Sequence, residues 1–251
     1  MSLAQTQSVA LLGLDGHVVG VEVDIADGLP GYSLLGLPDA ALSESRDRVR
    51  SAIVNCGEVW PNRKVTVSLS PAWLPKSGSS FDLAICISLL SAHETVPAEK
   101  IADIVFLGEL SLDGRIRSVR GVLPALIAAF KAGVTTAVVP AENLKEAQLM
   151  QGMNIVPMHH LKQVLRWLRT GERQQEQEFD LQWEHSDSRL DFADVAGQPA
   201  ARLAAEIAAV GGHHIMLIGP PGAGKTMIAE RIPTIMPALS IAQALEVTAV
   251  H

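Results

Sequence analysis

The feature that most constrains the fold is a glycine-rich segment of eight residues, Gly219–Thr226, with the sequence GPPGAGKT. The segment matches the pattern GxxxxGK[ST] without interruption. The apolar run 214–218 precedes it, and residues 227–231 can continue as a helix. This order of strand, glycine-rich turn and helix predicts a phosphate-binding loop inside an α/β domain. The alternative is a Gly/Pro-rich turn that matches the pattern by chance.

The residue types in the segment suit a nucleoside triphosphate. Its glycines allow the backbone to turn several N–H groups toward phosphate oxygens. Lys225 would place a positive charge beside the β- and γ-phosphates, and the Thr226 hydroxyl would ligate Mg²⁺. We therefore expect ATP and Mg²⁺ as cofactors. The expected binding residues are Gly219, Pro220, Pro221, Gly222, Ala223, Gly224, Lys225, Thr226 and Met227.

Turnover of ATP needs more than this loop. A second strand that ends in acidic residues should hold Mg²⁺ and polarise the attacking water. The 25 residues after Thr226 contain only the acids Glu230 and Glu246, and neither follows a strand-like run. We therefore expect an ATPase unit that is cut short, which binds nucleotide weakly and does not hydrolyse it alone.

An acidic segment divides the chain. Residues 172–194 hold eight acids against two bases, so they carry most of the net charge of −7. The segment is rich in Gln and Glu and lacks a sustained apolar period, which is typical of a solvated linker. We predict a first domain over 1–170, a linker over 171–190 and the N-terminal part of an ATPase domain over 191–251.

Strand-like and helix-like patterns alternate through the first domain. Two Asp-Gly pairs, Asp15-Gly16 and Asp113-Gly114, favour tight hairpin turns, which argue against a purely parallel sheet. The period changes to that of a helix at Ala40, and Gly57 is a natural stop. The expected strands lie at 8–14, 17–25, 32–37, 64–70, 103–112, 115–119 and 134–139. The expected helices lie at 40–56, 81–92, 122–132, 141–149 and 159–169. The expected fold is mixed α/β.

Composition excludes several classes of protein. With 48% hydrophobic and 19% charged residues the chain can bury a core and is not disordered. Cys56 and Cys86 are too far apart for a zinc motif of ordinary spacing, and we expect two buried thiols in a reducing compartment. The N-terminus lacks a basic region, and no apolar stretch is long enough for a membrane span. We expect a cytoplasmic protein without a membrane partner.

The run DFADVAGQ at 191–198, followed by AARLAAEIAAVGGHHIMLIGPPGAGKTM, resembles the start of the AAA+ module in magnesium-chelatase-like ATPases of the ComM/YifB family. Residues 1–170 resemble the Lon-protease-like, ribosomal-S5-domain-2-like domain that precedes that module. The resemblance implies an α/β Lon-like domain followed by the start of a P-loop AAA+ α/β domain. It also implies that Val195 and Ala196 help to seat adenine. The intact family implies a homo-hexameric ring that acts on DNA, with branch migration during natural transformation.

A peptidase is a competing hypothesis for the first domain. The run PKSGSSFD at 75–82 resembles the segment that carries the serine nucleophile of Lon proteases, and Ser80 matches that position. Leu123 stands where the lysine base would be, and an apolar side chain cannot accept a proton. Lys76 and Lys131 are the nearest substitutes in the sequence. We therefore favour a serine-rich turn that caps a helix over proteolysis.

Other candidates remain open. The runner-up function is a subunit that couples ATP to insertion of Mg²⁺ into a porphyrin, and a purely structural protein is a further alternative. For the pairs His213-His214 and His159-His160 we favour packing over metal ligation. Six arginines suggest phosphate contacts, although we favour solvated surfaces for them: Arg46, Arg48, Arg50, Arg115, Arg117 and Arg120.

Overall fold

The computed structural model describes residues 2–172, 190–240, 243–244 and 247–248 of the chain. The predicted linker, 171–190, therefore lies almost entirely outside the described residues. The chain divides into two compact units, Met1–Phe179 with Leu245–His251 and Asp180–Ala244.

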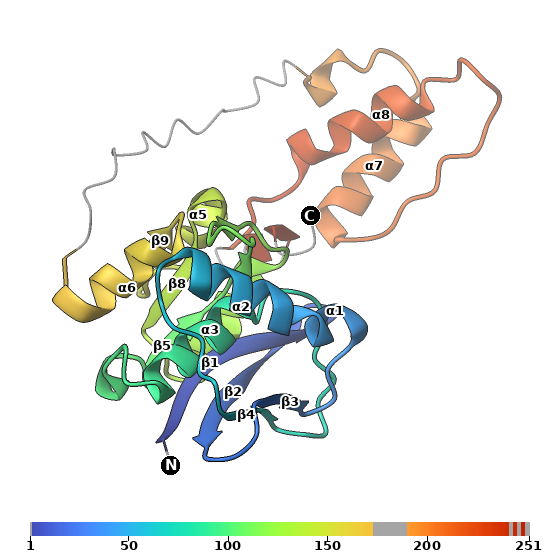
Figure 1. The fold of residues 1–251 in the computed structure, drawn as a ribbon. Coiled ribbons are helices and arrows are strands. Elements are labelled where there is room, and N and C mark those ends of the chain that lie inside the picture. The colour runs from blue at the N-terminus through green and yellow to red at the C-terminus, as the bar shows by residue number, and fades with distance from the viewer. Residues whose placement is uncertain (1, 173–189, 241–242, 245–246, 249–251) are drawn as a thin grey trace. The chain divides into compact units, whose positions relative to one another are not determined.

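The first unit is built on a mixed sheet, which within the described residues has seven strands in the order β3-β4-β2-β1-β5-β8-β9 (Figure 1). The pairs β1–β2 and β2–β4 are antiparallel, and the other neighbours run parallel. The sheet confirms the expected mixed α/β class. The strands are β1 (Ser2–Leu12), β2 (Asp15–Ala26), β3 (Gly31–Leu35), β4 (Lys64–Ser70), β5 (Ile104–Phe106), β8 (Thr136–Pro140) and β9 (Asn154–Met158).

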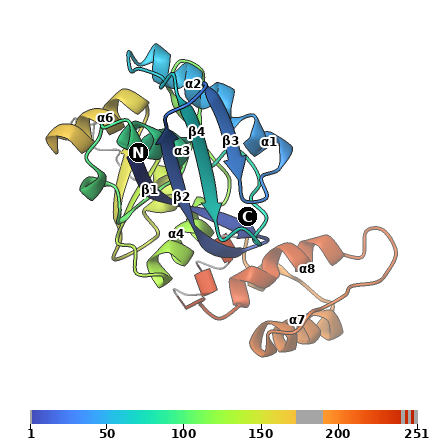
Figure 2. The ribbon, with the colours of Figure 1, turned by 60° about the horizontal axis from the view of Figure 1, so that its bottom comes forward.

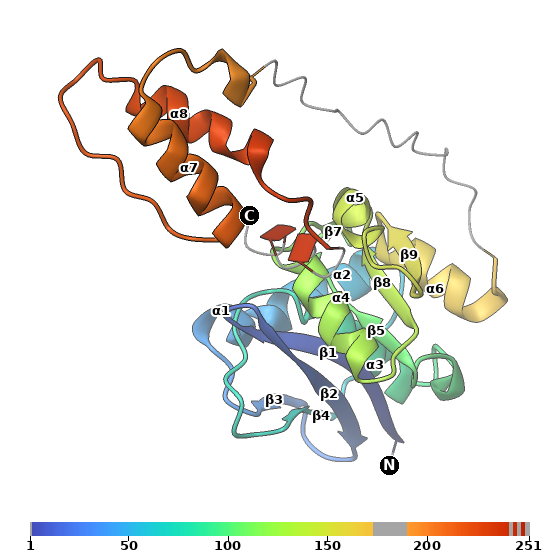
Figure 3. The ribbon, with the colours of Figure 1, turned by 180° about the vertical axis from the view of Figure 1, so that it is seen from behind.

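Helices cover both faces of this sheet because its central strands are apolar on both sides. Ile104 and Phe106 of β5 belong to one buried cluster with α3 (Asp82–Ala92), whereas Val105 belongs to another with α4 (Val122–Lys131). Figure 1 and Figure 3 show α3 and α4 on opposite faces. The helices α2 (Ser45–Asn55) and α6 (Leu161–Thr170) pack on the α3 side. Successive side chains of β5 point to opposite faces of the sheet, so this one strand contributes to both buried clusters.

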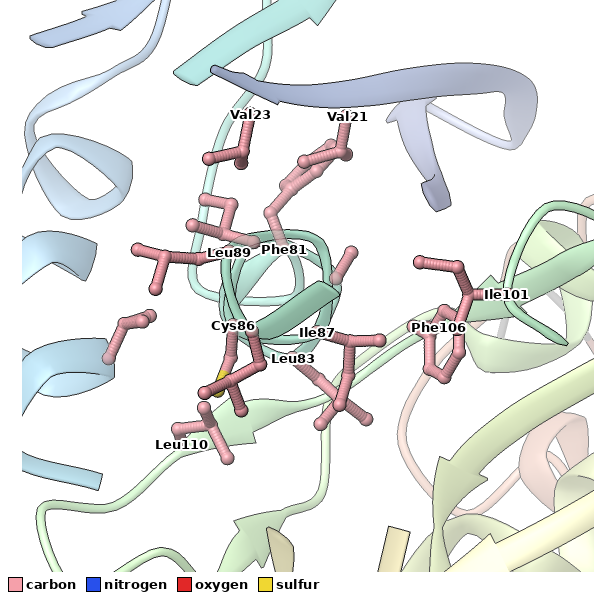
Figure 4. Packing of buried hydrophobic residues seen from close by; sticks show 14 of the residues in the cluster. Val21, Val23, Phe81, Leu83, Cys86, Ile87, Leu89, Ile101, Phe106 and Leu110 are labelled. Atoms are coloured by element: carbon pink, nitrogen blue, oxygen red, sulfur yellow. The ribbon is translucent and has the colours of Figure 1, made fainter. Parts of the chain in front are cut away.

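The helix α3 is the centre of the larger core. Every residue from Asp82 to Ala92 is buried, as expected for a helix that is apolar on all sides. Figure 4 looks along the helix and shows Val21 and Val23 on one side, with Phe106 and Ile101 on another. Shorter elements complete the unit: α1 (Ala40–Ser43), β6 (Glu109–Leu110), β7 (Ile116–Arg117), α5 (Leu144–Ala147) and the 3₁₀ turns η1 (Ala98–Lys100) and η2 (Ala141–Asn143).

The first hairpin turns two residues earlier than predicted. Leu12 pairs with Asp15, so Gly13 and Leu14 form the turn, and Gly13 has a positive φ of 64°. Gly16 lies inside β2, at the place where α4 packs (Figure 2). A Cβ atom at Gly16 would lie 2.5 Å from the Cβ of Ala128. The glycine therefore serves close packing of a helix against a strand, a use that the local turn signal did not reveal.

Two further predictions need correction. The run 103–112 is split, because β5 joins the main sheet while β6 pairs with β7 around the predicted turn at Asp113-Gly114. The edge strand β9 was missed, since Pro157 weakens the strand signal. An edge strand tolerates proline because one side of its backbone has no strand to bond.

The second unit consists of η3 (Phe192–Asp194), α7 (Pro199–Gly211), α8 (Lys225–Arg231) and η4 (Ile232–Ile235) (Figure 2). Its buried core is small: Phe192, Val195, Ala205 and Ile228. The predicted strand at 214–218 does not form. No described residue pairs with its backbone, and Met216 and Ile218 are 83% and 84% exposed. A strand needs a neighbouring strand to satisfy its N–H and C=O groups, so the apolar pattern alone is insufficient here.

A buried ion pair joins α2 to α3. The Nε and Nη2 atoms of Arg48 donate to the two carboxylate oxygens of Asp82 at 2.6 and 3.0 Å, and the Leu110 N–H also donates to Asp82. The Asp82 side chain has no exposed surface. Burial raises the pKa of Asp82 to about 6, and the bonds from Arg48 limit that rise. The pair therefore connects α2, α3 and the β6 segment.

We predict that Arg48→Met destabilises the first unit more at pH 8 than at pH 5. The raised pKa means that the folded state holds a proton on Asp82 more readily than the unfolded state. The contribution of Asp82 to the free energy of unfolding therefore falls as the pH rises from about 4 to 6. Without Arg48 the pKa rises further and the ionised carboxylate is left unpaired, which should cost about 3 kcal/mol at pH 8. Urea unfolding followed by circular dichroism measures both values.

The matched control is Arg50→Met on the same helix, because Arg50 lies 6.0 Å from the centre of the Trp60 ring and has no buried carboxylate partner among the described residues. Its effect should be small and independent of pH. Equal losses for Arg48→Met at pH 5 and pH 8 would show that the pair does not control the ionisation of Asp82.

Candidate phosphate-binding loop

The loop 219–226 is shaped by glycines at two positions with positive φ. Gly222 and Gly224 have φ values of 80° and 73°, which other residues rarely adopt. α8 begins directly after Gly224, at Lys225. Among the described residues, no acceptor bonds to the backbone N–H groups of Gly222, Gly224, Lys225 or Thr226. The loop therefore presents four free donors, whereas the Ala223 N–H between them donates to the Pro220 carbonyl.

The Lys225 side chain folds back over this loop. Its Nζ atom donates to the carbonyl oxygens of Gly219 and Pro220, both at 2.8 Å. Lys225 is half-buried, and Thr226 is exposed beside it. The structure thus brings together the lysine, the hydroxyl and the free N–H groups that the sequence singled out.

Gln198 contacts the loop and was missed by the sequence interpretation. Its Nε2 atom donates to the Ala223 carbonyl at 2.6 Å and would lie 3.0 Å from a Cβ atom at Gly224. Gln198 is the N-cap residue of α7 and has a left-handed backbone, with φ of 50°. The only sequence signal is its place directly before Pro199, which favours a helix start. This contact ties the segment 191–198 to the loop.

Val195 and Ala196 lie in that segment but differ in exposure. The Val195 side chain is fully buried in the small core with Phe192, and its carbonyl accepts a hydrogen bond from Arg202 at 2.9 Å. Arg202 also lies over the Phe192 ring at 5.7 Å. Ala196 is exposed. The Val195 side chain therefore holds the segment in place, and a ligand would meet the backbone and Ala196.

No metal cluster is visible in the described part of the chain, since no group of three or more His, Cys, Asp or Glu side chains could hold an ion there. His213 and His214 are exposed, and the His213 ring packs against Gly211, where a Cβ atom would lie 2.4 Å from it. His160 has another function. Its Nδ1 atom accepts from the Lys162 N–H and caps α6.

Among the described residues of the first unit, the candidate bases for Ser80 do not bond to it. Lys76 is buried, and its Nζ atom donates to the Leu69 and Pro71 carbonyls, while burial lowers its pKa. Leu123 is fully buried. Among the described residues, no lysine or histidine nitrogen bonds to the Ser80 hydroxyl.

The serine-rich turn was also expected to cap α3, but among the described residues no serine side chain does so. Phe81 is the N-cap residue and has no side-chain cap bond, whereas the Ser79 hydroxyl donates to Glu109. The reason is that the turn directs Ser79 across to β6 instead of back to the helix backbone.

The arginines of α2 are not simply solvated. Besides the Arg48 pair, Arg46 lies 5.9 Å from the centre of the Tyr32 ring. Arg115 pairs with Asp113 at 2.8 Å and stays exposed.

The two cysteines are free thiols, of which Cys86 is buried and Cys56 only half-buried. No helix in the described ranges is both long and apolar enough to cross a membrane.

Comparison with known proteins gives two family matches. The model described as subunit ChlI of Mg-chelatase matches residues 21–143, and the model described as magnesium chelatase, subunit ChlI, matches residues 191–251. A weaker similarity links the chain to Lon protease 2 of Herpetosiphon aurantiacus, with 28% identity over 163 residues. That alignment covers 60% of this chain and 20% of the Lon protein.

Three relatives align along the whole chain. An uncharacterized protein of Mycobacterium tuberculosis is 52% identical over 253 residues, covering 100% of this chain and 50% of that protein. The uncharacterized protein YifB of Escherichia coli is 40% identical over 250 residues, with 100% and 49% coverage. The competence protein ComM of Haemophilus influenzae is 36% identical over 255 residues, with 100% and 50% coverage. The chain spans about half the length of these curated relatives.

These matches agree with the sequence motifs, because the loop 219–226 lies inside the second matched region and the Lon-like similarity covers 60% of the chain. The chain belongs to the ComM/YifB family of magnesium-chelatase-like proteins, and its chelatase-like ATPase region begins near residue 191.

Proposed function

We propose that residues 191–251 bind ATP with Mg²⁺ through the loop 219–226, as the nucleotide-binding part of an AAA+ ATPase. The observation that carries the proposal is the set of free backbone donors at Gly222 and at 224–226, beside a lysine that is held by carbonyl groups alone. Phosphate oxygens are stronger acceptors than carbonyls, because charge-assisted bonds are about twice as strong as neutral ones. The loop therefore favours an anionic ligand.

Each residue would have a distinct part in binding. Lys225 would exchange the Gly219 and Pro220 carbonyls for the β- and γ-phosphates. The Thr226 hydroxyl would help to hold the Mg²⁺ ion, which would offset the negative charge of the nucleotide. Pro220, Pro221 and Ala223 would keep the loop in shape, and Met227 would continue the helix behind it. The backbone at Val195 and Ala196 would line the adenine site. ATP bound in this way supplies a phosphoryl group for hydrolysis.

We predict that ATP·Mg²⁺ raises the melting temperature of the second unit in the wild-type chain but not in Lys225→Ala. A ligand that binds only the folded state stabilises it by about 2.7 kcal/mol when its concentration is about 100 times the Kd. Thermal unfolding of the full chain by circular dichroism, with and without nucleotide, measures this effect.

Lys131→Ala is the control, because Lys131 is an exposed lysine in the first unit. It should respond to ATP·Mg²⁺ as the wild type does. A nucleotide response that survives in Lys225→Ala would contradict the assignment of Lys225.

We also predict that Gln198→Ala weakens ATP binding without abolishing it. The change removes the bond to the Ala223 carbonyl, so the loop must lose more conformational entropy when it binds. A decrease in affinity of about threefold to tenfold corresponds to the net value of one hydrogen bond. Titration with a fluorescent ATP analogue measures the Kd, and an unchanged Kd would show that Gln198 does not support the loop.

For the whole protein we propose a motor that uses ATP to act on DNA, in the cytoplasm and as a hexameric ring. Family membership supports this role, and one relative is named a competence protein. The finer proposal is branch migration during natural transformation. Arg115 and Arg117 are exposed on the β6–β7 segment, which makes them the residues to test for phosphate contacts.

If the chain acts on DNA in this way, it should bind a labelled four-way junction more tightly than a linear duplex of the same length. Affinity should fall steeply with salt, because phosphate contacts release counterions. Fluorescence anisotropy at two salt concentrations measures both effects. The variant Arg115→Gln with Arg117→Gln decides whether these side chains contribute. Equal retention of both DNA forms would count against the junction role.

A magnesium-chelatase subunit is the second candidate, because both family models carry that description. An assay of ATP-dependent Mg²⁺ insertion into a porphyrin, with the partner subunits of a chelatase added, separates the two functions. Insertion that depends on Lys225 would favour the chelatase over the DNA motor.

A further inference from the structure

A cavity of about 390 Å³ lies in the first unit, between the segment 77–80 that leads into α3 and the segment 118–122 that leads into α4. Its volume is within the range of pockets that bind small ligands or peptide ends. The proposed nucleotide site does not use these residues.

One wall of the cavity is apolar. Its half-buried apolar residues are Leu11 of β1 and Val119, whereas Val9, Val122 and Ala125, which also line it, are buried. An apolar side chain of a ligand would gain about 25 cal/mol for each Å² of surface buried there.

The other wall is polar and includes one free cation. Ser77, Ser80 and Ser118 line it with Arg120. The Arg120 side chain is exposed and has no ion-pair partner among the described residues. The backbone N–H groups of Ser79 and Ser80 also lack an acceptor in the described part of the chain. These groups all donate hydrogen bonds, so they suit an acceptor ligand with negative charge.

Glu109 is the one carboxylate that lines this cavity, and it is already engaged. It accepts the hydrogen bond from the Ser79 hydroxyl, which reduces but does not remove its repulsion of an anion. The cavity lacks a base for Ser80, because Lys76 donates to the Leu69 and Pro71 carbonyls. The arrangement therefore favours binding over hydrolysis.

We propose that this cavity binds the C-terminal carboxylate of an apolar peptide. The carboxylate lies against Arg120 and the serine donors, and the last side chain of the peptide lies against Leu11 and Val119. This proposal is independent of the nucleotide site, since it concerns the first unit alone.

The test compares two probes on the full chain, N-acetyl-Leu-Leu with a free carboxylate and the same dipeptide as its amide. Isothermal titration should show binding of the acid, with affinity for the amide at least tenfold weaker. Arg120→Gln should lower the affinity for the acid at least fivefold, because it removes the cation. Glu109→Gln should raise this affinity, because it removes the repelling charge. Arg115→Gln is the control, since Arg115 is an exposed arginine nearby in the sequence that does not line this cavity.

Three results would overturn the proposal. The first is no binding of the acid, the second is equal binding of acid and amide, and the third is equal loss in Arg120→Gln and Arg115→Gln. Ala125→Phe adds a steric test, because it fills the apolar wall and should abolish binding of the acid. Arg120 is exposed, so its variant remains informative if Ala125→Phe does not fold.

Discussion

The first unit depends on one buried charge. Asp82 begins a helix whose every residue is buried, and a carboxylate in that position is costly unless it is paired. Arg48 reaches it from α2 with two hydrogen bonds, and the Leu110 N–H reaches it from β6. The location at the first turn of α3 is also favourable, because the helix dipole stabilises negative charge there. One side chain thereby sets where α2, α3 and β6 meet.

The segment that precedes Asp82 takes its position from the same interaction. Ser79 and Ser80 lie three and two residues before it, and the Gly108 N–H donates to the Ser80 carbonyl at 3.1 Å. The Glu109 carboxylate accepts a hydrogen bond from the Ser79 hydroxyl. The serine segment that lines the cavity therefore leads directly into a buried helix and is tied to residues 108–109 by these hydrogen bonds. This location makes it suitable for recognition, because its donors are held in place before a ligand arrives.

The second unit differs from the first, because its most specific sequence motif belongs to a unit with only a small hydrophobic core among the described residues. Its hydrophobic cluster has four buried members in the described part of the chain, while large apolar side chains are exposed at Leu203, Ile207, Met216 and Ile218. The loop nevertheless has positive φ at two glycines and a lysine folded over its carbonyls. Local backbone geometry is therefore present where the surrounding sheet is not, because glycine conformation and the helix start depend on near neighbours. The stability of the nucleotide site is the part that ligand binding should change most.

The sequence by itself determined the features that depend on neighbours along the chain. The glycine-rich loop, the helix over 82–92 and the strand over 64–70 all follow from local pattern, and the family follows from motifs at 191–198 and 219–226. The tertiary structure decided what depends on distant residues. It made Gly16 a contact site for Ala128, made Arg48 the partner of Asp82, and brought Gln198 to Ala223. It also left 214–218 without a strand partner. Periodicity reports which side chains favour burial, but only the folded chain shows which groups they meet.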